Sequence, residues 1–378
     1  MMGISLNNKI PQVLITIILF SEFVTKIYGF HLNDFYVSLS FFVKISFVLF
    51  TFSIVIRNYK DQLSKYLICL FIYLLLELVI YKVNVKIDFY IYSIRYLYFL
   101  LLIIFLKTYN NSSRNELLKF LDFSLLVNSL LIIIGAGFQL YFFETYRGGR
   151  LGYNGIINMV SDTNYIYGFY ILVNIFNPII GRAKIIIFVN ILVAILTGTK
   201  TVIFLATLFL VIKLIKFNKK LFYILLSFFI TGSIVFKDFV IKNLSIMAKE
   251  HLWIYKDQGL LSSLTSTRFY NLTNSFKNIL NGELSIIDIF LYNRKFISYR
   301  VEMELFDVVF FWGVLGAILF LYIFYKVNML IVSKRDRIIL ICIFIISCFA
   351  GKLLTNFTSL LIMYSFFTSR PTILNEKN

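Results

Sequence analysis

Arg147 and Arg150 stand three residues apart in a turn that also holds Gly148, Gly149 and Gly152. Each guanidinium presents five N–H donors in a planar fork, and backbone N–H groups next to glycine are unobstructed by a Cβ atom. Such a turn suits a phosphate or pyrophosphate group. The alternative is an ordinary basic loop that meets lipid headgroups, and these residues alone do not separate the two interpretations.

Lysine occurs in two further polar interruptions of apolar sequence. Lys200 lies within Thr197-Gly198-Thr199-Lys200-Thr201, where hydroxyl groups surround an ammonium group, and the alternative is simply a polar turn. Lys352 follows Gly351 as in a phosphate-binding loop, but Ile346 occupies the position of the upstream glycine that such a loop needs. The sequence therefore predicts no nucleotide site there, and by itself the turn at 197–201 is interpreted as a polar turn.

Three carboxylates, Glu302, Glu304 and Asp307, lead into a strongly apolar segment. Glu304 and Asp307 are three residues apart and so share one helix face. Carboxylates at a membrane boundary are expensive if they face lipid, which predicts that they point into the bundle or into a wet cavity. The alternative is a favourable interaction with the helix dipole.

Lys44 and Arg95 fall in the middle of apolar segments, where a charge is costly. Each needs a partner or water. Glu77 and Asp122 on neighbouring segments are candidate partners, and structural pairing and contact with a substrate phosphate are equally compatible with the pattern. Glu22 and Lys26, four residues apart, are expected to neutralise one another.

The composition requires that these residues be positioned by membrane helices. Of 378 residues, 60% are hydrophobic and 15% are charged, and the mean hydropathy is +0.84. These values exclude a soluble enzyme with a single buried core and indicate an all-α, polytopic transmembrane helical bundle. The net charge of +18 is explained by basic loops on the inner side, so no nucleic-acid partner is expected. Three cysteines and two histidines show neither metal-ligand spacing nor a disulfide framework.

Twelve apolar segments are expected to span the membrane, and a ten-span arrangement is the alternative. They are 12–30, 35–56, 63–81, 88–106, 119–140, 163–180, 184–198, 201–216, 221–236, 303–325, 338–351 and 353–369. The pairs 184–216 and 338–369 are short for two crossings and are expected to form tight hairpins.

The basic residues of the short loops lie mostly on the side of the chain termini, which places both termini in the cytoplasm. Residues 1–236 then form nine spans with an outer Arg/Gly loop at 141–162. Residues 237–302 form a large extracytoplasmic loop or cap, and residues 303–378 form three spans and a cytoplasmic tail. Outer loops of this length are uncommon unless they are functional.

The order of these elements over roughly 120–370 resembles the Wzy-type O-antigen and capsular polysaccharide polymerases of the O-antigen ligase/polymerase superfamily. The resemblance is carried by motifs in chain order: the loop 147–164, the turn 197–201, Ser266-Thr267-Arg268, Asn281-Gly282, the acidic span entry with Trp312-Gly313-Val314-Leu315-Gly316, and Gly351-Lys352. Lys200 departs from an arginine usual in the family and loses its bidentate fork, and Lys352 departs from a histidine.

This resemblance implies a metal-independent integral-membrane glycosyltransferase without a cofactor, in the bacterial inner (plasma) membrane. It would join undecaprenyl-pyrophosphate-linked oligosaccharide repeat units at the outer face, with a chain-length regulator protein as a further partner. The implied roles are pyrophosphate binding by one set of cations, general-base catalysis by the carboxylates, and stacking on sugars by aromatic residues of the large loop. The cations are Arg147, Arg150, Arg268, Lys200 and Lys352, the carboxylates are Glu302, Glu304 and Asp307, and the aromatic residues are Trp253, Tyr255 and Tyr270.

Two other functions remain open at this point. A flippase for lipid-linked oligosaccharides would suit the charges within spans, although its outer loops are usually short. An O-antigen ligase of the same superfamily would transfer finished polysaccharide to a lipid core instead of extending it.

Overall fold

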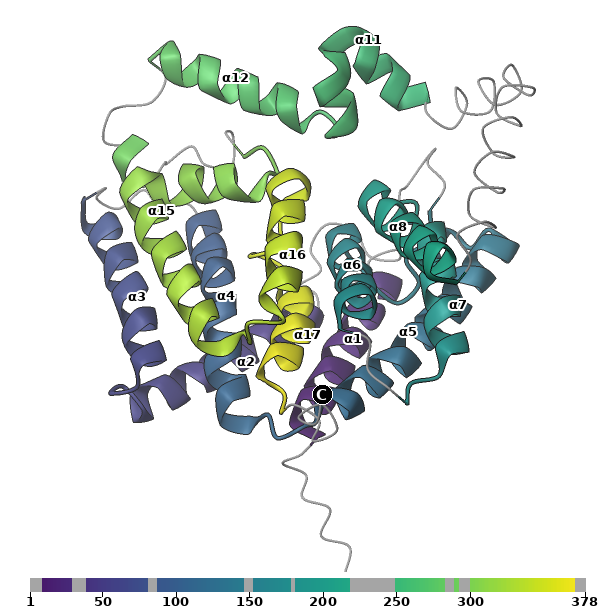
Figure 1. The fold of residues 1–378 in the computed structure, drawn as a ribbon. Helices are drawn as coiled ribbons and strands as arrows, with labels where there is room; N and C mark the ends of the chain where they lie inside the picture. The colour runs from purple at the N-terminus through teal and green to yellow at the C-terminus, as the bar shows by residue number, and fades with distance from the viewer. Residues whose placement is uncertain are drawn as a thin grey trace, which may run out of the picture.

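The computed structural model describes residues 9–28, 39–80, 87–145, 152–177, 181–217, 249–282, 289–291 and 300–370. The described elements are all helical, as expected for this composition. They are α1 (Ile10–Tyr28), α2 (Leu39–Arg57), α3 (Gln62–Ile80), α4 (Ile87–Tyr109), α5 (Arg114–Phe138), η2 (Tyr141–Phe143), α6 (Val160–Phe176), α7 (Lys184–Ala194), η3 (Ile195–Thr197), α8 (Lys200–Phe217), α11 (Lys249–Leu264), α12 (Arg268–Leu280), α15 (Glu304–Ile331), α16 (Arg337–Ala350) and α17 (Phe357–Thr368) (Figure 1).

Helix length corrects the expected number of spans. Five described helices are long and apolar enough to cross a membrane: α1, α2, α4, α5 and α15. These helices indicate a multi-pass helical membrane protein. Others are shorter: α16 has 14 residues, or about 21 Å of rise against a hydrocarbon core of about 30 Å. The expected segment 221–236 lies outside the described residues. The expectation of twelve full membrane crossings is therefore wrong for the described residues.

The expected hairpin over 338–369 is also corrected. The chain does break at residues 351–356, between α16 and α17. However, α16 packs mainly against α6 and α15, whereas α17 packs mainly against α4, α6 and α1 rather than against α16. The break therefore places residues 351–356 between different helices instead of at the tip of a tight pair.

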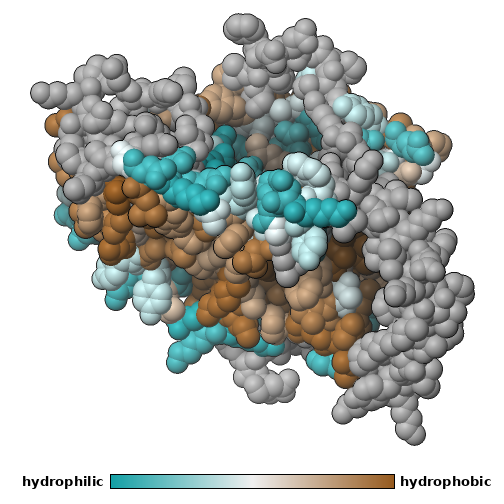
Figure 2. All heavy atoms as spheres, turned by 90° about the horizontal axis from the view of Figure 1, so that it is seen from above, coloured by the Kyte–Doolittle hydropathy of each residue, from teal (hydrophilic) through white to brown (hydrophobic). Residues whose placement is uncertain are grey.

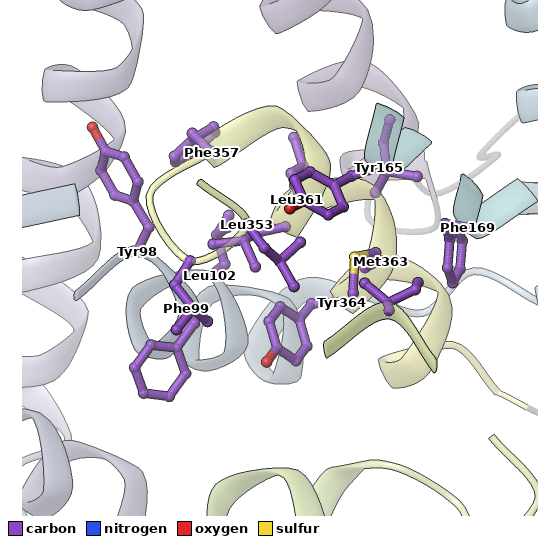
Figure 3. Close-up of a cluster of buried hydrophobic side chains, with 14 of the residues drawn as sticks. Tyr98, Phe99, Leu102, Tyr165, Phe169, Leu353, Phe357, Leu361, Met363 and Tyr364 are labelled. Carbon is purple, nitrogen blue, oxygen red and sulfur yellow. The ribbon is translucent and has the colours of Figure 1, made fainter. Parts of the chain in front are cut away.

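The core of the bundle lies where α17 meets α4 and α6. Figure 3 shows Phe99 of α4, Phe169 of α6 and Leu361 of α17 gathered there, and all three are at most 1% exposed. Residues 357–367 of α17 are buried on every side of the helix. A mostly apolar helix that is buried all round is typical of the interior of a membrane bundle.

The long helix α15 bends at Gly313. Its φ of 64° and ψ of 178° are not helical, and a Cβ atom at this position would lie 1.5 Å from the carbonyl oxygen of Leu291. Tyr73 of α3 stabilises the bend, because its hydroxyl donates a 3.2 Å hydrogen bond to the carbonyl of Trp312. The bend directs the first turns of α15 across the bundle end where the candidate site lies.

Helices α11 and α12, both from the large loop, lie across one end of the bundle (Figure 1). Seen from this side, hydrophilic side chains gather across the face, and hydrophobic side chains cover the flanks (Figure 2). Phe276 of α12 contacts Phe306 and Phe310 of α15, each with 6.1 Å between ring centroids. These contacts attach α12 to the membrane helices.

The charges inside the bundle find partners other than the expected ones. Lys44 forms a 3.0 Å ion pair with Glu22, so the expected pairing of Glu22 with Lys26 is wrong. Lys26 instead donates to the side chain of Asn154 and, at 2.8 Å, to the carbonyl of Gly155, where it holds the segment that follows the Arg/Gly loop.

The expected pairing of Asp122 with a charge inside an apolar segment is also wrong. Asp122 binds Arg182 of the α6–α7 connection, and the side chain of Glu77 lies outside the described residues. Arg95 lies over the ring of Tyr92, 5.3 Å from its centroid.

The opposite end of the bundle is tied together by polar contacts between helix turns. Arg114 at the start of α5 pairs with Asp336 of the α15–α16 turn at 2.6 Å, and Asn177 donates to the other oxygen of Asp336 at 3.0 Å. Lys107 of α4 lies 3.5 Å from Asp61 of the α2–α3 turn. The turns α2–α3, α4–α5 and α15–α16 therefore share the end that faces away from α12.

Candidate functional site

A cavity of about 850 Å³ lies beneath the start of α12, between the ends of α6, α8 and α16 and the segment that precedes α15. We call it the cation cavity because its charged lining residues are five cations and one carboxylate: Arg95, Lys200, Arg268, Arg300, Lys352 and Glu302. Positions far apart in the sequence therefore meet at one place. An excess of fixed positive charge in a partly enclosed site favours an anionic ligand.

Three helices begin at this cavity, which adds to its positive character. Val160, Lys200 and Arg268 are the first residues of α6, α8 and α12, and each lines the cavity. The N-terminus of a helix carries a partial positive charge and free N–H groups, so it attracts anions and disfavours cations. Lys200 and Arg268 therefore each destabilise the helix that they begin. Functional residues often break such a local rule.

Glu302 joins two of the cations. Its carboxylate lies 2.5 Å from the Lys352 ammonium group and 3.6 Å from the guanidinium of Arg268. Burial acts to raise the pKa of Glu302, but its hydrogen bond with Lys352 and the charges of Lys352, Arg268 and Arg300 hold the pKa below its usual value. Glu302 is therefore ionised at neutral pH and keeps both cations at the cavity wall.

Lys200 connects α8 to the turn between α11 and α12. Its ammonium group donates to the carbonyl of Ser263 at 2.9 Å and to the hydroxyl of Ser266 at 3.3 Å. The chain reaches Lys200 through Gly198, whose φ of 71° ends η3 in a left-handed conformation. The predicted polar turn thus fixes the large loop to the membrane helices at the edge of the cavity.

Tyr92 of α4 contacts two arginines of the cavity. Arg300 donates a 2.5 Å hydrogen bond to the Tyr92 hydroxyl, and the guanidinium carbons of Arg300 and Arg95 lie 5.2 and 5.3 Å from its ring centroid. Guanidinium groups stack favourably on aromatic faces. Tyr92 thereby positions two of the cations that line the cavity.

Unusual backbone conformations concentrate at the cation cavity. Five described residues other than glycine have a positive φ, and four of them lie here: Ser266, Thr267, Glu302 and Lys352. At Gly351 a Cβ atom would lie 2.0 Å from the carbonyl oxygen of Glu302. Residues in sparsely populated conformations cluster at functional sites, where the surrounding fold maintains them.

Some buried polar atoms at the cavity have no hydrogen-bond partner within the described structure. They are Oδ1 of Asn164, Nε of Arg268 and Nδ2 of Asn356, and all three residues line the cavity. Asn356 is only 5% exposed. A buried amide without a partner is unfavourable by roughly 1–3 kcal/mol, so a ligand with hydroxyl groups would improve the site.

The structure separates the three predicted general bases. Glu302 lines the cavity, whereas Glu304 and Asp307 are buried and are not part of its lining. Glu304 lies against the backbone N–H groups of Leu353 and Leu354, and its Oε2 has no hydrogen-bond partner in the described structure. Asp307 accepts a hydrogen bond from the Val301 N–H at 2.9 Å. These two carboxylates hold the segments that carry Lys352 and Glu302.

The structure describes only some of the predicted phosphate-binding residues. Lys200, Arg268 and Lys352 share the cation cavity, while Arg147 and Arg150 lie outside the described residues.

The predicted sugar-binding residues do not line this cavity. Trp253, Tyr255 and Tyr270 are exposed on α11 and α12, with 62%, 51% and 43% of their surface accessible. Stacking on a sugar that extends out of the cavity stays a prediction.

Sequence reasoning did not assign Arg300, Asn164 or Asn356 to the site, and it left Arg95 undecided. Arg95 and Asn356 carry a usable signal, since each is a polar side chain within an apolar segment. Arg300 resembles any interfacial arginine in the sequence, and only the fold brings it to Tyr92.

Among the described residues, no three His, Cys, Asp or Glu side chains come close enough together to hold a metal ion. No protein family, no characterised protein and no solved structure matches this chain.

Proposed function

We propose that this protein is an integral-membrane glycosyltransferase that polymerises lipid-pyrophosphate-linked oligosaccharides. The observation that carries the proposal is the cation cavity, where five cations and three helix N-termini surround a single carboxylate. This arrangement suits a ligand with two adjacent phosphates. The order of motifs that resembles the Wzy-type polymerases supports the same substrate class.

The reaction is a transfer of the growing chain between carriers. The bond between the sugar anomeric carbon and the pyrophosphate oxygen breaks, and a bond forms between that carbon and a hydroxyl oxygen of the acceptor repeat unit. The hydroxyl proton passes to a base, and the lipid pyrophosphate leaves with the bonding electrons. Cations that are fixed before the reaction stabilise the charge that develops on the leaving group.

Glu302 is the candidate base, because it is the carboxylate of the described cavity lining. Its pKa is lowered by Lys352 and Arg268, despite an opposing effect of burial, so it accepts a proton poorly in this state. A bound pyrophosphate competes for the same two cations. Once they turn to the phosphates, the pKa of Glu302 rises and the carboxylate becomes a better base.

The rest of the lining suits the other parts of such a substrate. Asn164 and Asn356 offer amide groups for sugar hydroxyls. Phe204, Ile345 and Phe349 also line the cavity and are 67%, 54% and 58% exposed. These apolar side chains provide a route for the lipid tail from the bilayer.

The test is polymer length in cells whose own gene is replaced by variants. We expect Arg268→Gln and Lys352→Gln to lower polymer formation at least about tenfold. Each variant removes a positive charge that would stabilise the negative charge developing on the departing pyrophosphate. Lys352→Arg should retain a substantial part of the activity. The control is Lys213→Gln, an exposed lysine of α8 that lies over Phe209, away from the cavity.

Protein level and thermal unfolding are measured for every variant, so that loss of folding is recognised. A full polymer ladder in Arg268→Gln and Lys352→Gln contradicts the proposal. Deletion of the gene separates the alternatives. Loss of a polymerase leaves single repeat units on the surface, loss of a flippase leaves none, and loss of a ligase leaves polymer on its carrier lipid.

A further inference from the structure

A second polar pocket, of about 680 Å³, lies at the end of the bundle opposite the cation cavity. It is formed by the α2–α3 turn and the last turns of α4. Its charged lining residues are Arg57, Lys60, Lys107 and Asp61, so cations exceed carboxylates here too. We call it the basic pocket.

The charges of the basic pocket are only loosely satisfied within the protein. Lys107 and Asp61 lie 3.5 Å apart and are 59% and 41% exposed, a geometry that contributes little to stability. Asp61 also accepts from the N–H of Leu63 at 3.2 Å, which caps the start of α3. Lys60 lies over the ring of Tyr59 at 5.8 Å. The cations therefore remain available to an anion.

Ser64 gives an independent indication of a ligand. It lines the basic pocket and is 1% exposed, yet its hydroxyl has no hydrogen-bond partner in the described structure. A serine within a helix can bond to the carbonyl four residues earlier, as Thr108 of the same pocket does with Ile104. The Ser64 hydroxyl is covered in this structure, and a rotation of its side chain toward the pocket would let a ligand oxygen satisfy it.

An apolar groove of about 510 Å³ continues from the basic pocket between α2 and α3. The two share Tyr59. The other lining residues of the groove are all apolar, among them Val55, Ile56 and Phe71, and Ile56 is 72% exposed. This face belongs to helices of a membrane bundle, so acyl chains are the medium around it.

We propose that the basic pocket and this groove together bind one anionic phospholipid, with its phosphate among Arg57, Lys60 and Ser64 and an acyl chain along the groove. A free phosphate would fill the pocket and leave the groove unused. A zwitterionic lipid would fill both and gain little from the excess cations. Basic pockets between transmembrane helices at the membrane surface are typical sites for anionic headgroups.

This site is separate from the proposed reaction. The α2–α3 turn and the α15–α16 turn share the end that faces away from α12, whereas the cation cavity lies beneath α12. The phospholipid is thus a bound structural ligand of the opposite leaflet and not the substrate. Its absence would leave the proposal for the cation cavity untouched.

The experiment uses the full chain, purified in detergent, with phosphatidylglycerol or phosphatidylcholine added. We expect phosphatidylglycerol to raise the thermal unfolding midpoint by about 3 °C or more, with bound lipid counted by native mass spectrometry. Phosphatidylcholine should have little effect. The double variant Arg57→Gln/Lys60→Gln should bind phosphatidylglycerol about tenfold more weakly or worse. Its control is Lys213→Gln/Lys216→Gln, which removes two exposed lysines of α8 outside the pocket.

A second pair of variants tests the groove. Ile68→Trp fills it from α3 and should weaken lipid binding without changing charge. Ile72→Trp is the control, since Ile72 is 50% exposed on the same helix and does not line the groove. If inorganic phosphate protects as well as phosphatidylglycerol, or if the double variant binds phosphatidylglycerol like the original chain, the proposal is wrong. Equal effects of Ile68→Trp and Ile72→Trp also contradict it.

Discussion

Glu302 connects two cations of the cation cavity, and its own backbone is strained. Its bonds to Lys352 and Arg268 hold two cations that would otherwise repel each other, and its own φ of 60° is strained. The ion pair is only partly buried, since the two side chains of Glu302 and Lys352 are 40% and 32% exposed. Water therefore screens the attraction, and its contribution to folding is modest.

We predict that Glu302→Gln lowers the free energy of unfolding by about 0.5–1 kcal/mol at neutral pH. The pKa of Glu302 is lowered from its usual 4.5. A carboxyl group with a lowered pKa stabilises the folded protein above its unfolded pKa and loses this effect as pH falls through the folded pKa. The difference between variant and original should therefore be constant above about pH 5 and shrink at lower pH.

Thermal unfolding in detergent over a pH series measures this difference. Asp257→Asn is the control, because Asp257 is an exposed carboxylate of α11 outside the cavity. A difference that grows as the pH falls would mean that Glu302 is not held ionised by its neighbours.

At the scale of residues, the sequence singles out two lysines that line the cavity, but it does not separate Glu302 from Glu304. Lys200 and Lys352 interrupt apolar segments and could be selected on that ground. Glu302 and Glu304 look alike in sequence, two residues apart at a span entry. Only the fold separates them, since it buries Glu304 and leaves Glu302 in the lining of the cavity.

At the scale of elements, the break between α16 and α17 depends on one glycine. Gly351 has a φ of 63°, its missing Cβ makes room for the Glu302 carbonyl, and its own carbonyl accepts a 2.5 Å hydrogen bond from Tyr165. Positive φ is accessible to glycine at no steric cost. The break thereby brings Lys352 against Glu302.

We predict that Gly351→Ala destabilises the protein by about 1–3 kcal/mol and lowers activity, because its methyl group displaces Glu302. Gly137→Ala is the matched control: Gly137 lies in α5, and a Cβ atom there would meet nothing within 4 Å. That change should be neutral or stabilise by up to about 1 kcal/mol. Unfolding in detergent measures both, and equal effects would show that Gly351 has no special role.

The elements themselves were largely predictable, but their lengths and partners were not. Apolar runs located α1, α2, α4, α5 and α15 because such runs have few other stable forms in a membrane. The same runs gave no sign that α16 and α17 pack on different helices, which depends on shape complementarity across the bundle. The helices α11 and α12 lie in a segment that was assigned only as a loop or cap, since its apolar content is low.

At the scale of the whole molecule, the two ends of the bundle carry different sites. The cation cavity and α12 occupy one end, and the basic pocket occupies the other. The distribution of Lys and Arg in short loops predicts that the end with the basic pocket is cytoplasmic. A polymerase that meets its substrates at the outer face needs the cation cavity on the other side.

We predict that single cysteines at the two ends react from opposite sides of the membrane. The background is a variant in which Cys69, Cys342 and Cys348 are replaced by alanine. Asn281→Cys, at the exposed end of α12, should react with an impermeant maleimide in intact spheroplasts. Lys334→Cys, exposed in the α15–α16 turn, should react only after the membrane is opened, because that turn shares the end of the basic pocket. The reverse pattern would place the cation cavity on the cytoplasmic side and would contradict the proposal that polymerisation takes place at the outer face.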